Sequence, residues 1–108
     1  MSEAVSGVRV ASLDELAPGT LTEVDVEGAS VCVARTDDGE VYAFRNNCSH
    51  KDFPLHTGTL EGHQIECSWH GARFDVKSGR ALRIPAIRPI RTYDVRIDGD
   101  DVFVIMED

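Results

Sequence analysis

Short runs of alternating hydrophobic and polar residues cover most of the chain. Val, Ile, Thr, Tyr and Phe recur in these runs, a pattern typical of β-strands that bury one face. Pairs such as Pro18-Gly19, Ser78-Gly79 and Asp98-Gly99 separate the runs, as expected for tight turns between antiparallel strands. We predict strands at residues 8–10, 21–26, 30–35, 41–45, 64–67, 73–76, 92–97 and 102–106. The pattern therefore predicts an all-β protein.

The segment from about residue 46 to residue 88 differs from its flanks. It is richer in Cys, His, Pro and aromatic residues, whereas the flanks alternate like sheet strands. We expect this segment to be a small insert on a larger β-base. Residues 1–108 are expected to form a single domain, because the chain is too short for a second domain of ordinary size. One helical turn is predicted at residues 12–16, where Ser12 and Glu15 have the spacing of a capping box.

Charge and cysteine usage narrow the class of protein. The chain has 11 Lys and Arg against 19 Asp and Glu, a net charge of -8 that disfavours nucleic acid and anionic membranes as partners. The first seven residues lack a basic region followed by an apolar run, and no stretch approaches the length of a bilayer span. We therefore expect a cytoplasmic protein. Two of the 3 cysteines stand close to histidines, which favours metal binding over disulfides.

Two short motifs, separated by sixteen residues, carry the chemistry. Each motif pairs one cysteine with one histidine: Cys48 with His50, and Cys67 with His70. A [2Fe–2S] cluster needs two ligands on each iron, and two Cys on one iron with two His on the other define a Rieske centre. We predict that Cys48 and Cys67 bind one iron and that His50 and His70 bind the other.

A zinc site is the main alternative for the same four residues. Zinc sites with two Cys and two His usually place two to four residues between the ligands of each half. Only Ser49 separates Cys48 from His50, a spacing that suits two loops around a dinuclear cluster better than one tetrahedral ion. The other alternative, unrelated buried cysteines and surface histidines, requires four coincidences.

The sequence around these four residues resembles the two ligand loops of Rieske proteins. The stretches Arg73-Phe74-Asp75, Ser78-Gly79 and 85–89 are also similar to ferredoxins of aromatic-ring-hydroxylating dioxygenase systems. This resemblance implies the Rieske fold, an antiparallel β-sandwich base with a small cluster-binding subdomain of two ligand loops and a proline loop. It also implies one Rieske-type [2Fe–2S] cluster, with Pro85 in the loop that covers it.

Departures from respiratory Rieske proteins indicate the subclass. Those proteins carry an extra cysteine in each ligand loop, and this chain has Phe53 and Trp69 at these positions. They also carry residues whose hydroxyl groups donate hydrogen bonds to the cluster sulfurs, and this chain has Ala72 and Phe74 there. Fewer hydrogen bonds to sulfur stabilise the reduced cluster less, so we predict a potential near the low end of the Rieske range, roughly −150 mV. We also predict an apolar shell around the cluster, formed by Phe53, Trp69, Phe74 and Pro85.

The resemblance implies a low-potential ferredoxin that carries single electrons from a flavin-dependent reductase to a terminal oxygenase. The chain is not expected to be an enzyme itself, because an oxygenase needs a further mononuclear iron site and a substrate pocket that no remaining stretch supplies. The alternative is a Rieske redox module that serves as a sensor, an iron–sulfur assembly accessory or a small subunit of a larger reductase such as nitrite reductase. A zinc-stabilised interaction module is a third class.

We assign no chemical role to several other cysteine, histidine and arginine residues. Cys32 lies in an apolar strand and is expected to be a buried, inert thiol. His56 and His63 are expected to be solvated side chains without a carboxylate partner. A basic cluster either faces solvent or docks a partner, and it consists of Arg80, Arg83, Arg88 and Arg91.

Overall fold

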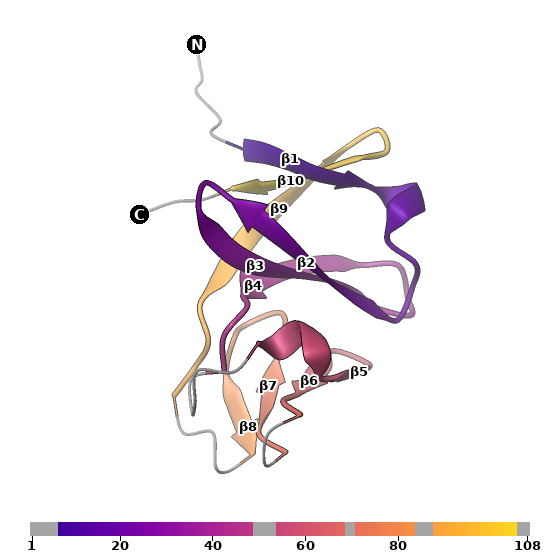
Figure 1. Ribbon diagram of the computed structural model, residues 1–108. Helices are drawn as coiled ribbons and strands as arrows, with labels where there is room; N and C mark the ends of the chain where they lie inside the picture. Colours follow the sequence, from indigo (N-terminus) through magenta and orange to yellow (C-terminus); the bar gives the residue numbers. More distant parts are fainter. Residues whose placement is uncertain (1–6, 49–53, 69–70, 84–87, 106–108) are drawn as a thin grey trace.

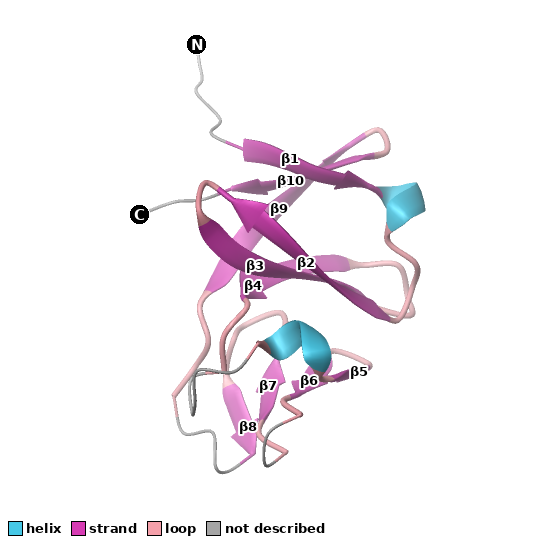
Figure 2. Cartoon of the chain, in the orientation of Figure 1, coloured by secondary structure: helices cyan, strands magenta, loops and turns pink. Residues whose placement is uncertain are grey.

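The structure is a computed structural model, and it describes residues 7–48, 54–68, 71–83 and 88–105. Nearly all of its regular structure is antiparallel β-sheet (Figures 1 and 2). Over the described residues, one sheet has six strands and a smaller sheet has four. The predicted all-β class is confirmed. No helix among these residues is long and apolar enough to cross a lipid bilayer.

The larger sheet folds over on itself to form a sandwich. Its strands, in spatial order, are β1 (Gly7–Ser12), β10 (Asp101–Ile105), β9 (Thr92–Asp98), β4 (Val41–Arg45), β3 (Ala29–Arg35) and β2 (Thr20–Val26). Strand β9 pairs with β4 through Thr92 and Tyr93 and with β10 through residues 94–98. It thus passes from one layer to the other, as the predicted β-sandwich base requires.

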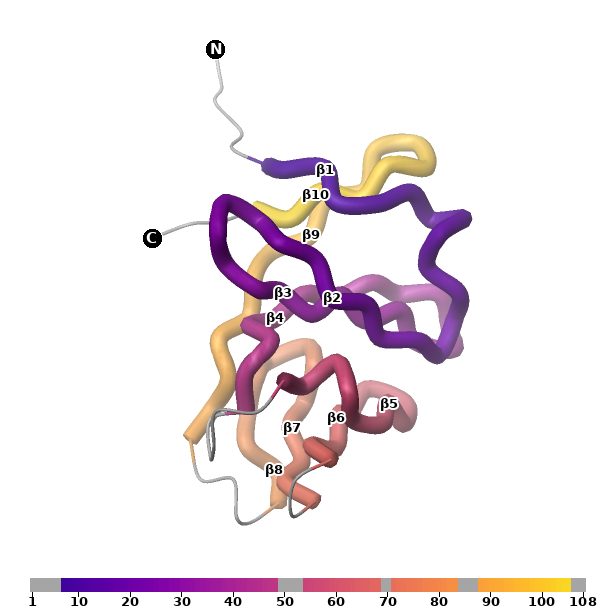
Figure 3. Tube along the Cα trace, in the orientation of Figure 1, coloured from indigo at the N-terminus to yellow at the C-terminus, as the bar shows by residue number. Residues whose placement is uncertain are grey.

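The smaller sheet lies between β4 and β9 in the chain. Its strands are β5 (Thr59–Glu61), β6 (Gln64–Glu66), β7 (Arg73–Asp75) and β8 (Ala81–Arg83), in that spatial order. The chain leaves the larger sheet after β4, forms the smaller sheet and returns in β9 (Figure 3). Strands β5 and β8 were not predicted.

Two single-turn 3₁₀ helices complete the described structure. Helix η1 (Leu13–Glu15) confirms the predicted turn, and the backbone N–H of Ser12 donates to Oε1 of Glu15 at 2.9 Å. Helix η2 (Leu55–Thr57) was not predicted. It lies between the larger sheet and the strands of the smaller one (Figure 1), and therefore joins the two parts of the molecule.

Strand β3 is buried on both faces and separates two hydrophobic cores. Val31 and Val33 point into the core between the layers of the sandwich, together with Val102 and other aliphatic residues. Cys32 and Ala34, which alternate with them, point into a second core that contains residues of the smaller sheet. This second core fixes the smaller sheet against the base.

Gly79 joins the turn between β7 and β8 to the segment that precedes β9. Its backbone N–H donates to the Asp75 carbonyl at 2.7 Å, and its carbonyl accepts from the Ile90 N–H at 2.8 Å. A Cβ atom here would lie 2.2 Å from the Ile90 oxygen. Gly79 has φ of +81°, and Gly99 has φ of +62° with no atom within 4 Å of its Cβ position.

We expect Gly79→Ala to lower the free energy of unfolding by about 1–3 kcal/mol more than Gly99→Ala. Both alanines are forced to a positive φ and share that strain, so the difference between them isolates the clash with the Ile90 carbonyl and the 3.0 Å approach to Cγ2 of Thr92. Denaturant unfolding of the two variants measures it. Equal losses would show that the segment before β9 moves aside without penalty.

Candidate metal centre

The two cysteines predicted as ligands lie in one buried cluster. Cys48 follows β4 by three residues and Cys67 directly follows β6. Their exposed fractions are 2% and 1%, and both belong to the second core, the one that holds the smaller sheet. The structure thus brings together two thiols that are nineteen positions apart in the sequence. The other predicted ligands, His50 and His70, lie outside the described residues.

The segment that begins at Cys67 is closed by a β-hairpin. Glu66 pairs with Arg73 across β6 and β7, and the backbone N–H of Cys67 donates to the Ala72 carbonyl at 2.7 Å. Gly71 adopts φ of +72°, which a glycine accepts without strain. Cys67 and Ala72 therefore face each other at the end of the β6–β7 ladder, and this ladder sets the position of Cys67.

Arg73 ties together three strands behind this hairpin tip. Its guanidinium lies 2.8 Å from Oε1 of Glu61 on β5 and 3.1 Å from Oε1 of Glu66 on β6, and it also donates to Oε1 of Gln64 at 3.2 Å. The hydrogen bond to Glu61 is the largest cause that raises the pKa of Arg73. The guanidinium stays charged and links the strands that carry the second ligand segment.

The segment that contains Cys48 is bounded by Asn46 and His56. No prediction for Asn46 followed from the sequence, and His56 was expected to be a solvated side chain. Asn46, two residues before Cys48, is 7% exposed, and its backbone N–H donates to the Ser30 carbonyl on β3 at 3.1 Å. Its side-chain Oδ1 accepts from the backbone N–H of His56 in η2 at 2.8 Å. Asn46 and His56 thus enclose residues 47–55, the first ligand segment.

The expectation that His56 and His63 lack a carboxylate partner was wrong, although His63 is exposed as predicted. Nε2 of His56 lies 3.7 Å from Oε1 of Glu23, and Nε2 of His63 lies 3.3 Å from Oδ2 of Asp38. The His56 side chain is only 29% exposed. Each carboxylate comes from the larger sheet or its turns, far from the histidine in sequence, so local spacing gave no sign of it.

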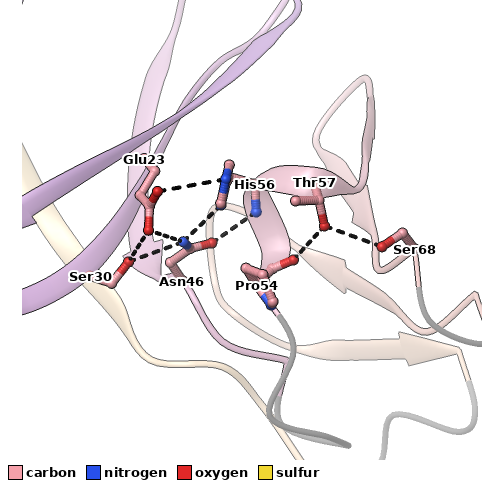
Figure 4. Close-up of polar contacts among 7 residues, drawn as sticks. All are labelled: Glu23, Ser30, Asn46, Pro54, His56, Thr57 and Ser68. Carbon is pink, nitrogen blue, oxygen red and sulfur yellow. Dashed lines mark hydrogen bonds and ion pairs between the residues drawn. The ribbon is translucent and has the colours of Figure 1, made fainter.

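Thr57 links the first ligand segment to the second (Figure 4). Oγ1 of Thr57 donates to the Pro54 carbonyl at 2.9 Å and lies 3.2 Å from Oγ of Ser68. The hydroxyl of Thr57 has one hydrogen, which Pro54 takes, so Ser68 is the donor to Thr57. This bond joins η2, at the end of the first segment, to the residue after Cys67.

The surroundings of the two thiols suit an iron–sulfur cluster. Ala72 and Phe74 have no exposed surface and lie in the same core as Cys48 and Cys67. Two buried thiols at the entrances of two mutually bonded loops, next to apolar side chains, supply thiolate ligands and a low-dielectric shell. The position of Phe74 fits its predicted place in the shell, while Phe53, Trp69 and Pro85 lie outside the described residues.

The third cysteine, Cys32, lies in the same core but on strand β3 and not in a loop. Cys32 is fully buried, as predicted, and burial raises the pKa of its thiol far above the usual range. A thiol held in the neutral form is a poor nucleophile and a poor metal ligand.

The four arginines of the basic cluster are all exposed. The Arg91 guanidinium lies over the Tyr93 ring, 5.4 Å from its centroid.

These features define an all-β protein in which a sandwich base presents a smaller sheet and a buried pair of cysteines at two bonded loops. The chain belongs to the Rieske [2Fe–2S] domain family, whose match spans residues 6–94. Its cofactor is one Rieske-type [2Fe–2S] cluster.

Individual relatives are similar over nearly their whole length. The ferredoxin component of biphenyl 2,3-dioxygenase from Rhodococcus jostii (strain RHA1) is 38% identical over 99 residues, 92% of each chain. The ferredoxin of carbazole 1,9a-dioxygenase from Nocardioides aromaticivorans IC177 is 43% identical with a TM-score of 0.89, over 94% of this chain and 98% of that one. A ferredoxin in complex with the reduced oxygenase of carbazole 1,9a-dioxygenase is 31% identical with a TM-score of 0.87, over 94% of each chain.

Proposed function

We propose that this protein is a Rieske ferredoxin that carries single electrons from a flavin-dependent reductase to a terminal oxygenase in the cytoplasm. Cys48 and Cys67 bind one iron of the cluster, and His50 and His70 bind the other. Residues 46–88 serve as the cluster-binding subdomain. The observation that carries this proposal is the burial of Cys48 and Cys67 in one core, at two loops that are linked through Thr57.

The cluster, when bound, supplies one-electron redox chemistry. The protein's own residues hold it and exclude water from it. The β6–β7 hairpin sets the position of Cys67 through the hydrogen bond to Ala72, and Cys48 follows three residues after the end of β4. The apolar side chain of Phe74 lies in the same core as both thiols, and this lowers the local dielectric around the cluster.

The proposed partners come from the relatives. Proteins at 33–43% identity are named as ferredoxin components of dioxygenase systems or as their ferredoxin, and one structural relative is held in a complex with an oxygenase. The smaller sheet lies at one end of the β-base (Figure 1). A cluster held at that end would suit alternate contacts with a donor and an acceptor. The flavin-dependent reductase as donor follows from the same resemblance.

The low potential is supported by the residues beside the second ligand segment. Ala72 and Phe74 carry no hydroxyl group and are completely buried. Neither side chain can donate a hydrogen bond to a cluster sulfur, so the reduced cluster lacks that stabilisation and the potential stays near the low end of the Rieske range.

Anaerobic purification followed by a redox titration tests the proposal. We expect a coloured protein that accepts one electron per chain, with a potential of roughly −150 mV and the low-temperature paramagnetic resonance of a reduced Rieske cluster. A colourless protein that contains zinc contradicts the proposal, and so does a potential as high as that of respiratory Rieske proteins.

A further inference from the structure

The first ligand segment, residues 47–55, is closed by two hydrogen bonds between the residues on either side of it (Figure 4). The backbone N–H of His56 donates to Oδ1 of Asn46 at 2.8 Å. Nδ2 of Asn46 lies 2.9 Å from Nδ1 of His56. We call this pair the clasp. The segment within it contains both Cys48 and His50.

The clasp determines the form of the His56 ring. A backbone N–H only donates, so the Asn46 atom that faces it is the oxygen, and the amide nitrogen faces the ring. The amide nitrogen has no lone pair to offer, so Nδ1 of His56 must accept. The ring in the clasp is therefore neutral and carries its proton on Nε2, the nitrogen that lies 3.7 Å from Glu23.

The clasp is anchored on the larger sheet. Oγ of Ser30 on β3 lies 3.1 Å from Nδ2 of Asn46 and donates to Oε2 of Glu23 on β2 at 2.9 Å. Nδ2 of Asn46 also lies 3.3 Å from the same oxygen of Glu23. The Asn46 backbone is bonded to β3 as well. Because these partners lie on adjacent strands of the sandwich, they hold the clasp in a fixed place.

We propose that Asn46 and His56 are positioning residues that hold the first ligand segment in its ligating geometry, with neutral His56 as the hydrogen-bond acceptor and Glu23 and Ser30 as the anchor. This inference rests on the proposed assignment of Cys48 and His50 as ligands. The clasp links the segment to the rigid base, and the Thr57–Ser68 bond next to it extends the link to the second segment. Loss of the acceptor frees one end of the segment.

Three variants of the holoprotein separate this role from a general effect on folding. His56→Leu removes the acceptor at similar size. His56→Asn keeps an acceptor, because Oδ1 of asparagine occupies the place of Nδ1. His63→Leu is the matched control, because His63 also faces a carboxylate and is half exposed but does not adjoin a ligand segment.

The measurements are the rate of cluster loss to an iron chelator under anaerobic conditions and the paramagnetic resonance of the reduced cluster. We expect His56→Leu to lose its cluster about tenfold faster than the wild type and to show shifted or broadened resonance lines. The rate of cluster loss from His56→Asn should remain within about threefold of the wild-type rate, because the substitution weakens the hydrogen bond without removing it. His63→Leu should match the wild type in both measurements.

The proposal would be overturned if His56→Leu lost its cluster at the wild-type rate and kept the wild-type resonance lines. It would also be overturned if His56→Asn and His56→Leu lost the cluster at equal rates. If His56→Leu does not fold, Ser30→Ala decides, because Ser30 is exposed and its hydroxyl bonds both Asn46 and Glu23 in the anchor. Cluster loss about threefold faster than wild type then supports the clasp, and an unchanged rate refutes it. Retention of the cluster by Cys48→Ala would instead overturn the ligand assignment.

Discussion

Cys48→Ala and Cys67→Ala are each expected to yield protein with less than about a tenth of the wild-type iron, since even residues outside the first shell of a metal contribute 10–100-fold to its affinity. Under the proposed assignment, each substitution removes one of the two thiolates that bind the same iron. The remaining ligands cannot complete its coordination. Iron and acid-labile sulfide per chain, with the visible absorption spectrum, measure the loss.

Cys32→Ser is the matched control for these ligand variants. Its thiol is fully buried in the same core as the two proposed ligands, so the variant tests whether any cysteine of this core matters for the cluster. We expect it to keep the wild-type iron content with some loss of stability from the buried hydroxyl. Loss of the cluster from Cys32→Ser with retention in Cys67→Ala would reverse the assignment.

His70→Ala and His50→Ala extend the same test to the second iron. Loss of the cluster in both completes the four-ligand set. If the purified variants instead keep one zinc ion per chain, the site is a mononuclear one and the proposed function fails with it.

Ala72→Ser and Phe74→Tyr are expected to raise the reduction potential, each by about 60 mV if the new hydroxyl gives the reduced cluster a hydrogen bond worth about 1.4 kcal/mol more than it gives the oxidised one. The sign follows from charge, because reduction makes the cluster sulfurs more negative and better acceptors. Ala72 lies beside Cys67, since its carbonyl accepts from the Cys67 N–H. A redox titration of each holoprotein gives the potential.

Ala43→Ser controls for the cost of burying a hydroxyl. Ala43 is 1% exposed and lies in the core within the sandwich, apart from the core that contains Cys48 and Cys67. We expect Ala43→Ser to lose stability without any shift in potential. An unchanged potential in both Ala72→Ser and Phe74→Tyr would show that the absence of hydroxyls at these positions does not account for a low potential.

The histidines show where reasoning from the sequence stopped. The motif of Cys48 and His50 is local, so its residue types and spacing could be interpreted directly. The partners of His56 and His63 could not, because Glu23 and Asp38 lie in the preceding strands and turns and approach only after the two sheets pack. Asn46 offered one clue, a polar residue close to a ligand, but its burial depends on the base.

For strand β3, the sequence predicted burial but not which elements cover its two faces. The run Val31-Cys32-Val33-Ala34 indicated a buried strand, yet a continuous apolar run does not say what covers each face. The structure places Val33 in the sandwich and Cys32 in the core with the smaller sheet. Strands β5 and β8 were missed because short strands owe their existence to pairing with β6 and β7 rather than to their own residues.

The sequence by itself determined the all-β class and the position of the insert, and it predicted the four cluster ligands, because alternation, turn residues and ligand spacing are local properties of the chain. Only the tertiary structure decided which elements hold the ligand segments. The clasp of Asn46 and His56, its anchor on Glu23 and Ser30, and the hydrogen bond between Thr57 and Ser68 all join residues distant in sequence or lying on different elements. Such contacts form only when packing has removed the chain's freedom to place these groups elsewhere.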